Sequence, residues 1–317
     1  MLLQAARRTY RHWVIDSTRW EHFQTRPGDI VIATYPKCGT TWMQRIVSLL
    51  VHQSPAPVAL SQMSPWIEMR IIEPIEVAAA RLADQTHRRF VKTHLPFDGL
   101  PFHDDINYIH VARDGRDACM SYHNHCTGLT DDALAMLDQA GAADAEVNRD
   151  YPRPAADPAA FFHTWINHGA VPGHDDGLPH LSFFALEESY WAQRTQANVL
   201  LVHYNDLKAD LQTEMQRIAD FLKISLPPAI LPSLVEAASF ESMRRDADQL
   251  LSAHGKMFKG GNELFFFKGQ NQRWRGVVDD ADLALYDAKV TQMFSPACAA
   301  WVAQGRLVAG EPRLAPD

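Results

Sequence analysis

The chain has 317 residues, of which 46% are hydrophobic and 21% charged, so it can bury a large core and has an ordinary globular composition. Its formal charge of −8 excludes the overall basic field of nucleic-acid-binding proteins, and nucleic acid is not an expected partner. No window approaches the ~18 consecutive apolar residues of a membrane-spanning helix, so no transmembrane segment is expected.

The N-terminal stretch and the cysteines bear on location. The first twenty residues contain no sustained apolar run, which makes them a poor signal peptide. The four cysteines, at positions 38, 119, 126 and 298, suggest neither a disulfide framework nor a Cys-x-x-Cys metal knuckle. A reducing cytoplasm is therefore the expected location.

Short apolar runs alternate with helical patterns along the chain. Strands are predicted at 29–34, 88–93, 106–112 and 197–204. Helices are predicted at 40–53, 115–125 and 208–224. Near-continuous apolar strands that alternate with helices are typical of a parallel sheet covered on both faces. We therefore predict an α/β fold in a single domain over 1–317, with a central, mostly parallel sheet, helices on both faces and a P-loop-like strand–loop–helix.

Two stretches interrupt this alternation. Residues 126–160 are rich in Ala, Asp and Pro, and residues 168–180 have the composition of a loop. Both are expected on the rim of the sheet, where such segments form lids, selectivity loops or merely solvated surface. Residues 126–180 are thus predicted to be a variable insert or lid region, and residues 310–317 a loose tail.

The first predicted strand runs into TYPKCGTTW at 34–42, which has the features of a phosphate-binding turn. Gly39 allows a tight turn and a close approach of ligand to backbone. Thr40 and Thr41 open the next helix, where unpaired amides and the helix dipole favour an anion, and Lys37 adds a positive charge. The turn is not a Walker A loop, because its lysine precedes the glycine by two residues. An ordinary capped helix with a surface lysine is the alternative interpretation.

Arg113 follows the third predicted strand, and Ser121 lies eight residues later in the next helix. Ligands of parallel sheets sit at the carboxyl ends of the strands, where the fork of an arginine and a hydroxyl group can bind a phosphate. The alternative is a surface ion pair of Arg113 with Asp114 or Asp117.

Lys92 and His94 lie two residues apart at the end of the second predicted strand. Residues two apart on a strand project to the same side, so the two side chains are expected to lie together. His94 can serve as a general base if a substrate hydroxyl is near, or it can be a neutral structural histidine.

In order and in separation, four segments resemble the sulfotransferases that use 3′-phosphoadenosine 5′-phosphosulfate (PAPS), specifically the cytosolic type. The segments are TYPKCGTTW, VKTHLP (91–96), VARDGRDACMSY (111–122) and FFFKGQNQRWRG (265–276). The resemblance spans residues 30 to 276. It implies an enzyme that moves a sulfuryl group from PAPS to a hydroxyl of a small, hydrophobic acceptor, which is a phenol, an alcohol or a lipid. The product would be adenosine 3′,5′-bisphosphate (PAP), and no metal would be required.

The resemblance also implies a role for each matching residue. His94 would be the general base, Lys37 would neutralise the leaving phosphate oxygen, and Lys92 would stabilise the sulfuryl oxygens. Arg113, Ser121 and Lys268 would hold the 3′-phosphate. The other donor-binding residues implied are those of the turn, the adenine site and the late segment: Cys38, Gly39, Thr40, Thr41, Trp42, Tyr204, Phe240, Phe267 and Gly269. For the aromatic ones, plain core packing is the alternative.

The late segment departs from the family pattern at several positions. Phe267 stands where the family has an arginine that contacts the 3′-phosphate, and Gln272 and Arg273 replace a Gly-Asp pair. Arg273 or Arg275 could supply the missing charge. The residues after Trp-Arg at 274–275 do not match the family's dimerisation motif, so that dimer is not implied and the oligomeric state is left open.

The acceptor and two histidine clusters leave further alternatives. Aromatic residues of the variable regions could line an acceptor site or belong to the core: Trp66, Phe97, Phe102, Phe161, Phe162 and Trp165. Neither cluster has the regular spacing of zinc ligands: His123, His125 and Cys126, or His168, His174 and His180 with Asp175 and Asp176. The first is expected to border the acceptor pocket and the second to form a lid or an exposed loop. A kinase or a non-catalytic nucleotide-binding protein is the alternative function.

Overall fold

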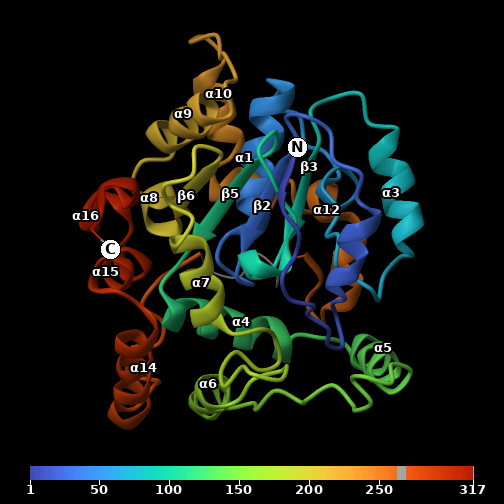
Figure 1. Cartoon of the computed structure of the whole chain (residues 1–317), viewed down its shortest axis with the longest axis vertical. Coiled ribbons are helices and arrows are strands. Elements are labelled where there is room, and N and C mark those ends of the chain that lie inside the picture. The colour runs from blue at the N-terminus through green and yellow to red at the C-terminus, as the bar shows by residue number, and fades with distance from the viewer. Residues whose placement is uncertain (263–268, 317) are drawn as a thin grey trace.

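The computed structural model describes residues 1–262 and 269–316. Its centre is a parallel sheet in the order β3-β2-β5-β6 (Figure 1). The strands are β2 (Ile30–Thr34), β3 (Phe90–Thr93), β5 (Asn107–Ala112) and β6 (Val199–His203). Each of these lies within a predicted run, and all of them pair in parallel. The predicted α/β class with a parallel sheet is confirmed.

Alternate residues of each strand pack on opposite faces of the sheet, because side chains of a strand point up and down in turn. Ile32 pairs with Ile109 of β5 and lies in one core cluster, while its neighbour Val31 lies in the other. Since both faces are covered, every residue of β2 is buried. This explains the unbroken apolar runs in the sequence.

Helices cover both faces of the sheet. One face carries α1 (Thr40–His52), α9 (Leu211–Phe221) and α10 (Leu231–Ala237). The core cluster of the other face includes residues of α3 (Ile75–Ala83), α4 (Gly115–Thr127), α6 (Pro158–Asn167), α7 (Phe183–Trp191), α14 (Asp280–Met293) and α15 (Pro296–Gln304). A smaller cluster joins α2 (Leu60–Met63), α11 (Phe240–Arg245) and α12 (Ala247–Leu251).

Short elements complete the chain. They are β1 (Leu2–Gln4), which pairs antiparallel with β4 (Phe102–His103), the 3-10 helices η1 (Ser17–His22), η2 (Phe97–Gly99), η3 (Ser252–Met257) and η4 (Pro312–Leu314), and the helices α8 (Tyr204–Ala209) and α16 (Arg306–Ala309). In the tail, Arg313 donates to the carbonyl oxygen of Val199 at 2.9 Å. Within the described part of the chain, no helix is both long and apolar enough to span a membrane.

The helix predicted over 208–224 is wrong in its extent, because two helices meet there. Asp210 has an extended backbone, with φ −149° and ψ 81°, and its side chain accepts a hydrogen bond from the amide of Thr213. A capping aspartate of this kind starts a new helix, so α8 ends at Ala209 and α9 begins at Leu211. The apolar spacing continues across the break, which is why periodicity alone did not reveal it.

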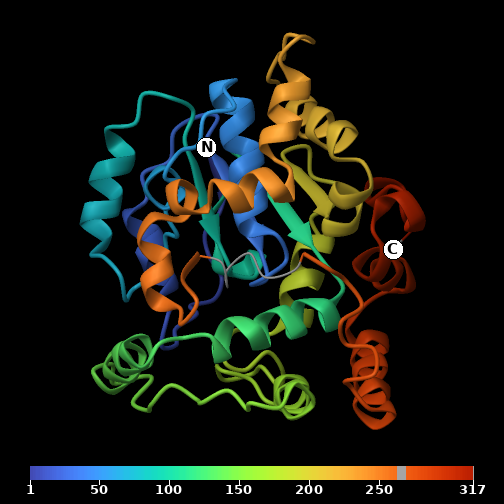
Figure 2. The ribbon, with the colours of Figure 1, turned by 180° about the vertical axis from the view of Figure 1, so that it is seen from behind.

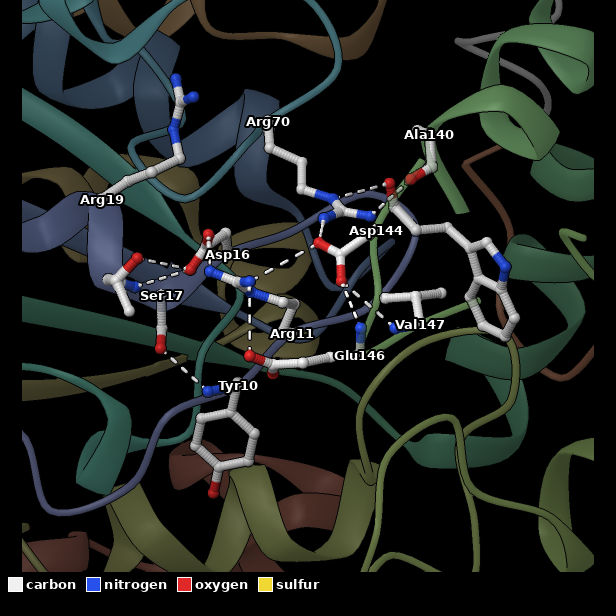
Figure 3. Close-up of polar contacts among 12 residues, drawn as sticks. Tyr10, Arg11, Asp16, Ser17, Arg19, Arg70, Ala140, Asp144, Glu146 and Val147 are labelled. Atoms are coloured by element: carbon white, nitrogen blue, oxygen red, sulfur yellow. Dashed lines mark hydrogen bonds and ion pairs between the residues drawn. The ribbon is translucent and has the colours of Figure 1, made fainter. Parts of the chain in front are cut away.

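The insert at 126–160 contains a helix, α5 (Asp131–Ala142), which Thr130 caps by accepting from the amide of Ala133. Figure 3 shows how the end of this helix is fastened to the segment around Arg70. Arg70 forms an ion pair with Asp144 and donates to the carbonyl oxygen of Ala140 at 3.0 Å. The insert is thus joined to the rest of the fold by a half-buried ion pair and is not merely solvated surface.

Candidate functional site

The carboxyl ends of β2, β3 and β5 open on one cavity of about 950 Å³. Seen from behind, the orange segment that carries α11 and α12 crosses in front of the sheet, and the green α4 lies below it (Figure 2). Residues of the phosphate turn line this cavity together with Lys92, His94 and Arg113. The strand ends therefore bring together the three separate motifs that the sequence predicted.

The phosphate turn is shaped by two residues with left-handed backbone. Lys37 has φ 70° and Gly39 has φ 109°, and Gly39 directly precedes α1. A Cβ atom on residue 39 would lie 3.2 Å from the ring of Tyr204, so the glycine is needed both for its backbone angle and for this close packing. No described side chain caps the first turn of α1, whose amides open on the cavity side.

His94 is held in one tautomer by the end of β2. Its Nδ1 lies 2.7 Å from the carbonyl oxygen of Thr34, and a carbonyl can only accept, so Nδ1 carries the hydrogen. The lone pair is therefore on Nε2. Burial lowers the pKa of His94 well below its usual value, and Lys92 and His180 lower it further. The imidazole is neutral at pH 7 and able to accept a proton.

Lys37 and Lys92, two of the lysines that line the cavity, are half-buried cations. Burial lowers the pKa of Lys37 to about 8, with Arg113 and Lys92 adding to the effect. Burial also lowers the pKa of Lys92 to about 8, although Glu68 opposes this, and its Nζ lies 5.1 Å from the centre of the Trp66 ring. Desolvated positive charges of this kind favour an anionic ligand.

Glu68 is a site residue that sequence reasoning missed. It is fully buried, and Oε1 accepts from the amide of His94 at 2.6 Å and from the hydroxyl of Thr93 at 2.9 Å, while Oε2 accepts from Trp20 Nε1 at 3.0 Å. Burial raises the pKa of this carboxyl. Glu68 thereby fixes the backbone from which His94 projects. The only sequence feature that pointed to it was a lone acid in the apolar run SPWIEM.

Arg113 faces the cavity instead of the surface, and it is 5% exposed. Its Nη1 donates to the carbonyl oxygen of Lys37 at 3.1 Å and its Nη2 to Asn271 Oδ1 at 2.8 Å, while its guanidinium lies 4.4 Å from the centre of the Tyr204 ring. Asp114 is paired with Arg116 at 2.6 Å, which removes the surface-pair interpretation for that aspartate. Ser121, on α4, lines the same cavity.

The aromatic residues predicted around the adenine come together. The rings of Trp42 and Tyr204 pack edge to face with centroids 5.4 Å apart, and Trp42 Nε1 donates to the carbonyl oxygen of Ala238 at 2.8 Å. Phe240 also lines the cavity. All three residues line the cavity, and Trp42 and Phe240 also pack against the neighbouring core clusters.

The late segment is described only in part. Phe267 and Lys268 lie outside the described residues. Gly269 lines the cavity, has φ 58°, and its carbonyl oxygen accepts from Lys208 Nζ at 2.8 Å. Of the two arginines that could supply charge, Arg273 lines the cavity, whereas Arg275 stacks on Trp274 at 5.2 Å and borders a separate surface pocket.

The part of the cavity expected to receive an acceptor has a different lining from the one that the sequence predicted. Trp66 lines it, but the other five aromatic candidates are buried core residues that do not: Phe97, Phe102, Phe161, Phe162 and Trp165. Apolar residues of loops, of η3 and of α5 form the wall instead: Val14, Met69, Ile71, Leu129, Met136, Leu137, Met257 and Phe258. The sequence could not reveal these, because single apolar residues in loops have no periodic pattern.

The second histidine cluster was predicted to form a lid or an exposed loop, and burial excludes an exposed loop for two of its members. His180 and Asp176 are each 2% exposed, and His180 lines the cavity. Of the first cluster, His125 lines the cavity, while His123 lies 3.0 Å through Nε2 from the carbonyl oxygen of Ala155. Among the residues that the structure describes, no three potential metal ligands converge.

Comparison with known proteins identifies relatives along nearly the whole chain. The family model described as Sulfotransferase domain matches residues 27–295. A glycolipid sulfotransferase of Mycobacterium bovis is 34% identical over 311 residues, which is 94% of each chain. Mouse sulfotransferase 1B1 is 29% identical over 238 residues, covering 72% of this chain and 69% of the relative.

Solved structures show the same fold. Retinol dehydratase, in complex with androsterone and the inactive cofactor PAP, superposes with a TM-score of 0.68 at 21% identity, covering 89% of this chain and 87% of that one. A mouse sulfotransferase complexed with PAP gives 0.63 at 20% identity, with 88% and 89% coverage.

Proposed function

Because the chain belongs to the sulfotransferase family, as its sequence motifs predicted, we propose that it moves a sulfuryl group from PAPS to a hydroxyl of an amphiphilic acceptor, with His94 as the general base. The observation that carries this proposal is the convergence of the neutral His94 ring, two desolvated lysines and Arg113 on one cavity at the strand ends.

The residues at one end of the cavity fit an adenylate with two phosphates. The amides at the start of α1 and the ammonium of Lys37 suit the 5′ end, as expected for a helix N-terminus. Arg113 and Ser121 suit the 3′-phosphate. Trp42, Tyr204 and Phe240 suit the base. When bound, PAPS supplies a sulfuryl group on a good leaving group.

Proton transfer and charge stabilisation are the work of this chain's own side chains. His94 Nε2 accepts the proton of the acceptor hydroxyl, while Nδ1 stays bonded to Thr34 so that the ring keeps its orientation. Lys92 and Lys37 provide positive charge where negative charge develops on oxygen during transfer. Sulfuryl transfer resembles phosphoryl transfer in depending mainly on such positioning and charge.

The acceptor is proposed to be a molecule with an apolar body and a hydroxylated head. The wall of the acceptor side is largely apolar, which suits an alkyl or sterol body. The similar mycobacterial proteins are named glycolipid sulfotransferases. A lipid that carries a sugar headgroup is therefore the acceptor class that we favour within the range expected from the sequence.

Radiolabelled transfer tests the proposal. Purified protein is incubated with ³⁵S-labelled PAPS and a panel of glycolipids, sterols and phenols, and labelled product is separated by chromatography. Transfer to at least one glycolipid is expected. If PAP raises the melting temperature but no acceptor is labelled, the protein is a non-catalytic nucleotide binder. If ATP with magnesium stabilises the protein and PAP does not, the donor assignment is wrong.

A further inference from the structure

His180 is a buried histidine that lines the cavity. It lies in the irregular segment between α6 and α7 and is 2% exposed. Neither Nδ1 nor Nε2 hydrogen-bonds to any residue that the structure describes. Most buried polar groups in native proteins are paired, so a ring with two unpaired nitrogens calls for an explanation.

The unpaired ring lies beside the proposed base. His180 and His94 both line the cavity, with ring centroids 5.8 Å apart and planes at 88°. Trp66 packs against both rings, at 4.7 Å from His94 and 6.4 Å from His180. The two imidazoles thus share one end of the cavity, which is the end proposed to receive the acceptor.

One neighbour of His180, Tyr35, has its hydroxyl group engaged with other residues. The hydroxyl of Tyr35, whose ring centroid is 6.0 Å away, donates to the carbonyl oxygen of Gly177 at 3.3 Å and accepts from Trp165 Nε1 at 2.8 Å. Burial lowers the pKa of His180 to about 3, so the ring is neutral and has one donor and one acceptor nitrogen. A hydroxyl group, which also donates and accepts, is its natural complement.

We propose that His180 binds a second hydroxyl group of the acceptor, on the carbon next to the one that carries the reacting hydroxyl. This rests on the proposed function, because it takes His94 as the base. The ring separation of 5.8 Å leaves room for two adjacent hydroxyls, since a ring nitrogen and an oxygen pair at about 2.9 Å. A bond from His180 to the reacting oxygen itself would withdraw the electron density needed for attack.

The consequence is selection for vicinal hydroxyl groups, such as those of a sugar, over single alcohols of the same apolar length. A site built to hydrogen-bond a hydroxyl rejects an analogue that lacks it more strongly than a hydrophobic pocket rejects a missing methylene. His180 is thereby a specificity residue for the acceptor and plays no part in donor binding.

The test compares octane-1,2-diol with octan-1-ol, which differ only in the second hydroxyl. Binding to the PAP-saturated protein is measured by calorimetry, and sulfation is measured with labelled PAPS. The wild-type protein is expected to favour the diol by roughly 10-fold or more. His180→Phe should bring this preference close to one by weakening the diol alone, and His180→Gln should restore part of it.

The control is His123→Phe on α4, a buried histidine outside the cavity, which should keep the wild-type preference. PAP affinity and melting temperature are recorded for each variant. Equal affinity of the wild-type protein for both compounds, or an equal loss for both in His180→Phe, would overturn the proposal. Binding with the expected preference but without transfer of label would uphold it and refute the proposed catalysis instead.

Discussion

The two ends of the cavity are built differently. At the proposed donor end, the groups come from strand ends and the turns directly after them, as with Lys37 after β2 and Arg113 after β5. At the proposed acceptor end, the wall comes from loops, from η3 and from α5, and Arg70 joins α5 to the rest of the fold. The positions of the groups at the first end are fixed by the sheet and can be predicted from short sequence motifs. The wall at the second end depends on contacts between segments that are distant in the sequence.

The largest effect is expected from the loss of the proposed base. His94→Ala removes the proposed base, and turnover should fall by roughly 10²-fold or more, as is usual when a general base is lost. PAP affinity should stay near that of the wild type, because the His94 ring is not among the groups that are proposed to bind the donor. Steady-state kinetics and calorimetry check both; turnover close to the wild type contradicts the role.

Loss of Arg113 should damage the donor end alone. Arg113→Ala removes a buried guanidinium, and PAP affinity should fall roughly 10- to 100-fold, as expected for the loss of charge-assisted hydrogen bonds. The matched control is Arg116→Ala, since Arg116 pairs with Asp114 and stacks 4.3 Å from the centre of the Trp274 ring without lining the cavity. Titration with PAP that gives equal losses for both variants would refute the assignment.

Glu68→Gln should lower turnover by about 10-fold with little change in the KM for either substrate. The carboxyl group accepts at both oxygens, whereas an amide accepts at only one, so either the bonds to His94 and Thr93 or the bond to Trp20 is lost and the anchor of the His94 backbone is weakened. The pH dependence of turnover, measured for the variant and the wild type, distinguishes a misplaced His94 from general damage to the fold. A variant with a normal melting temperature and normal turnover would show that the contact has no catalytic consequence.

The pKa values of the lysines predict how donor affinity depends on pH. Lys37 and Lys92 have pKa values lowered to about 8, so they are charged below that pH and lose their protons above it. PAP phosphates are already ionised at pH 7.5, because their second pKa is about 6. PAP affinity should therefore fall several-fold between pH 7 and pH 9, and binding near pH 8 should take up protons.

Calorimetry in buffers of different ionisation enthalpy measures that proton uptake. Lys37→Arg retains the charge at every pH in this range and should reduce the uptake while keeping binding. An affinity that does not change between pH 7 and pH 9 would show that neither lysine faces the bound phosphates.

The smallest effect is expected from the anchor of α5. Arg70→Ala should raise the KM of the acceptor a few-fold, because α5 supplies Met136 and Leu137 to the acceptor wall, and should leave PAP affinity unchanged. Arg153→Ala is the matched control, since Arg153 pairs with Asp138 of the same helix at 2.5 Å but is half exposed. Unchanged acceptor kinetics in Arg70→Ala would show that the wall keeps its shape without this pair.

The same contrast explains what the sequence could predict. Apolar runs gave the parallel sheet, and the motifs around Lys37, Lys92, His94 and Arg113 meet at one cavity as expected. The contacts of Glu68 and the burial of His180 could not be predicted from the sequence, because each depends on packing between segments that are far apart in the chain. The break between helices at Asp210 was not predicted either, because a helix cap depends on a single hydrogen bond between one side chain and one amide.

The position of Thr34 bears on the distance between His94 and the phosphate turn. This single residue ends β2, accepts a hydrogen bond from the imidazole of His94 through its carbonyl oxygen, and is followed at once by the residues that are proposed to bind the donor. The gap between the proposed proton acceptor and the proposed phosphate-binding turn is therefore set by one hydrogen bond and a few peptide units. A shift of the outer helices would change which molecules can enter the cavity. It would leave the distance over which the sulfuryl group is proposed to move almost unchanged.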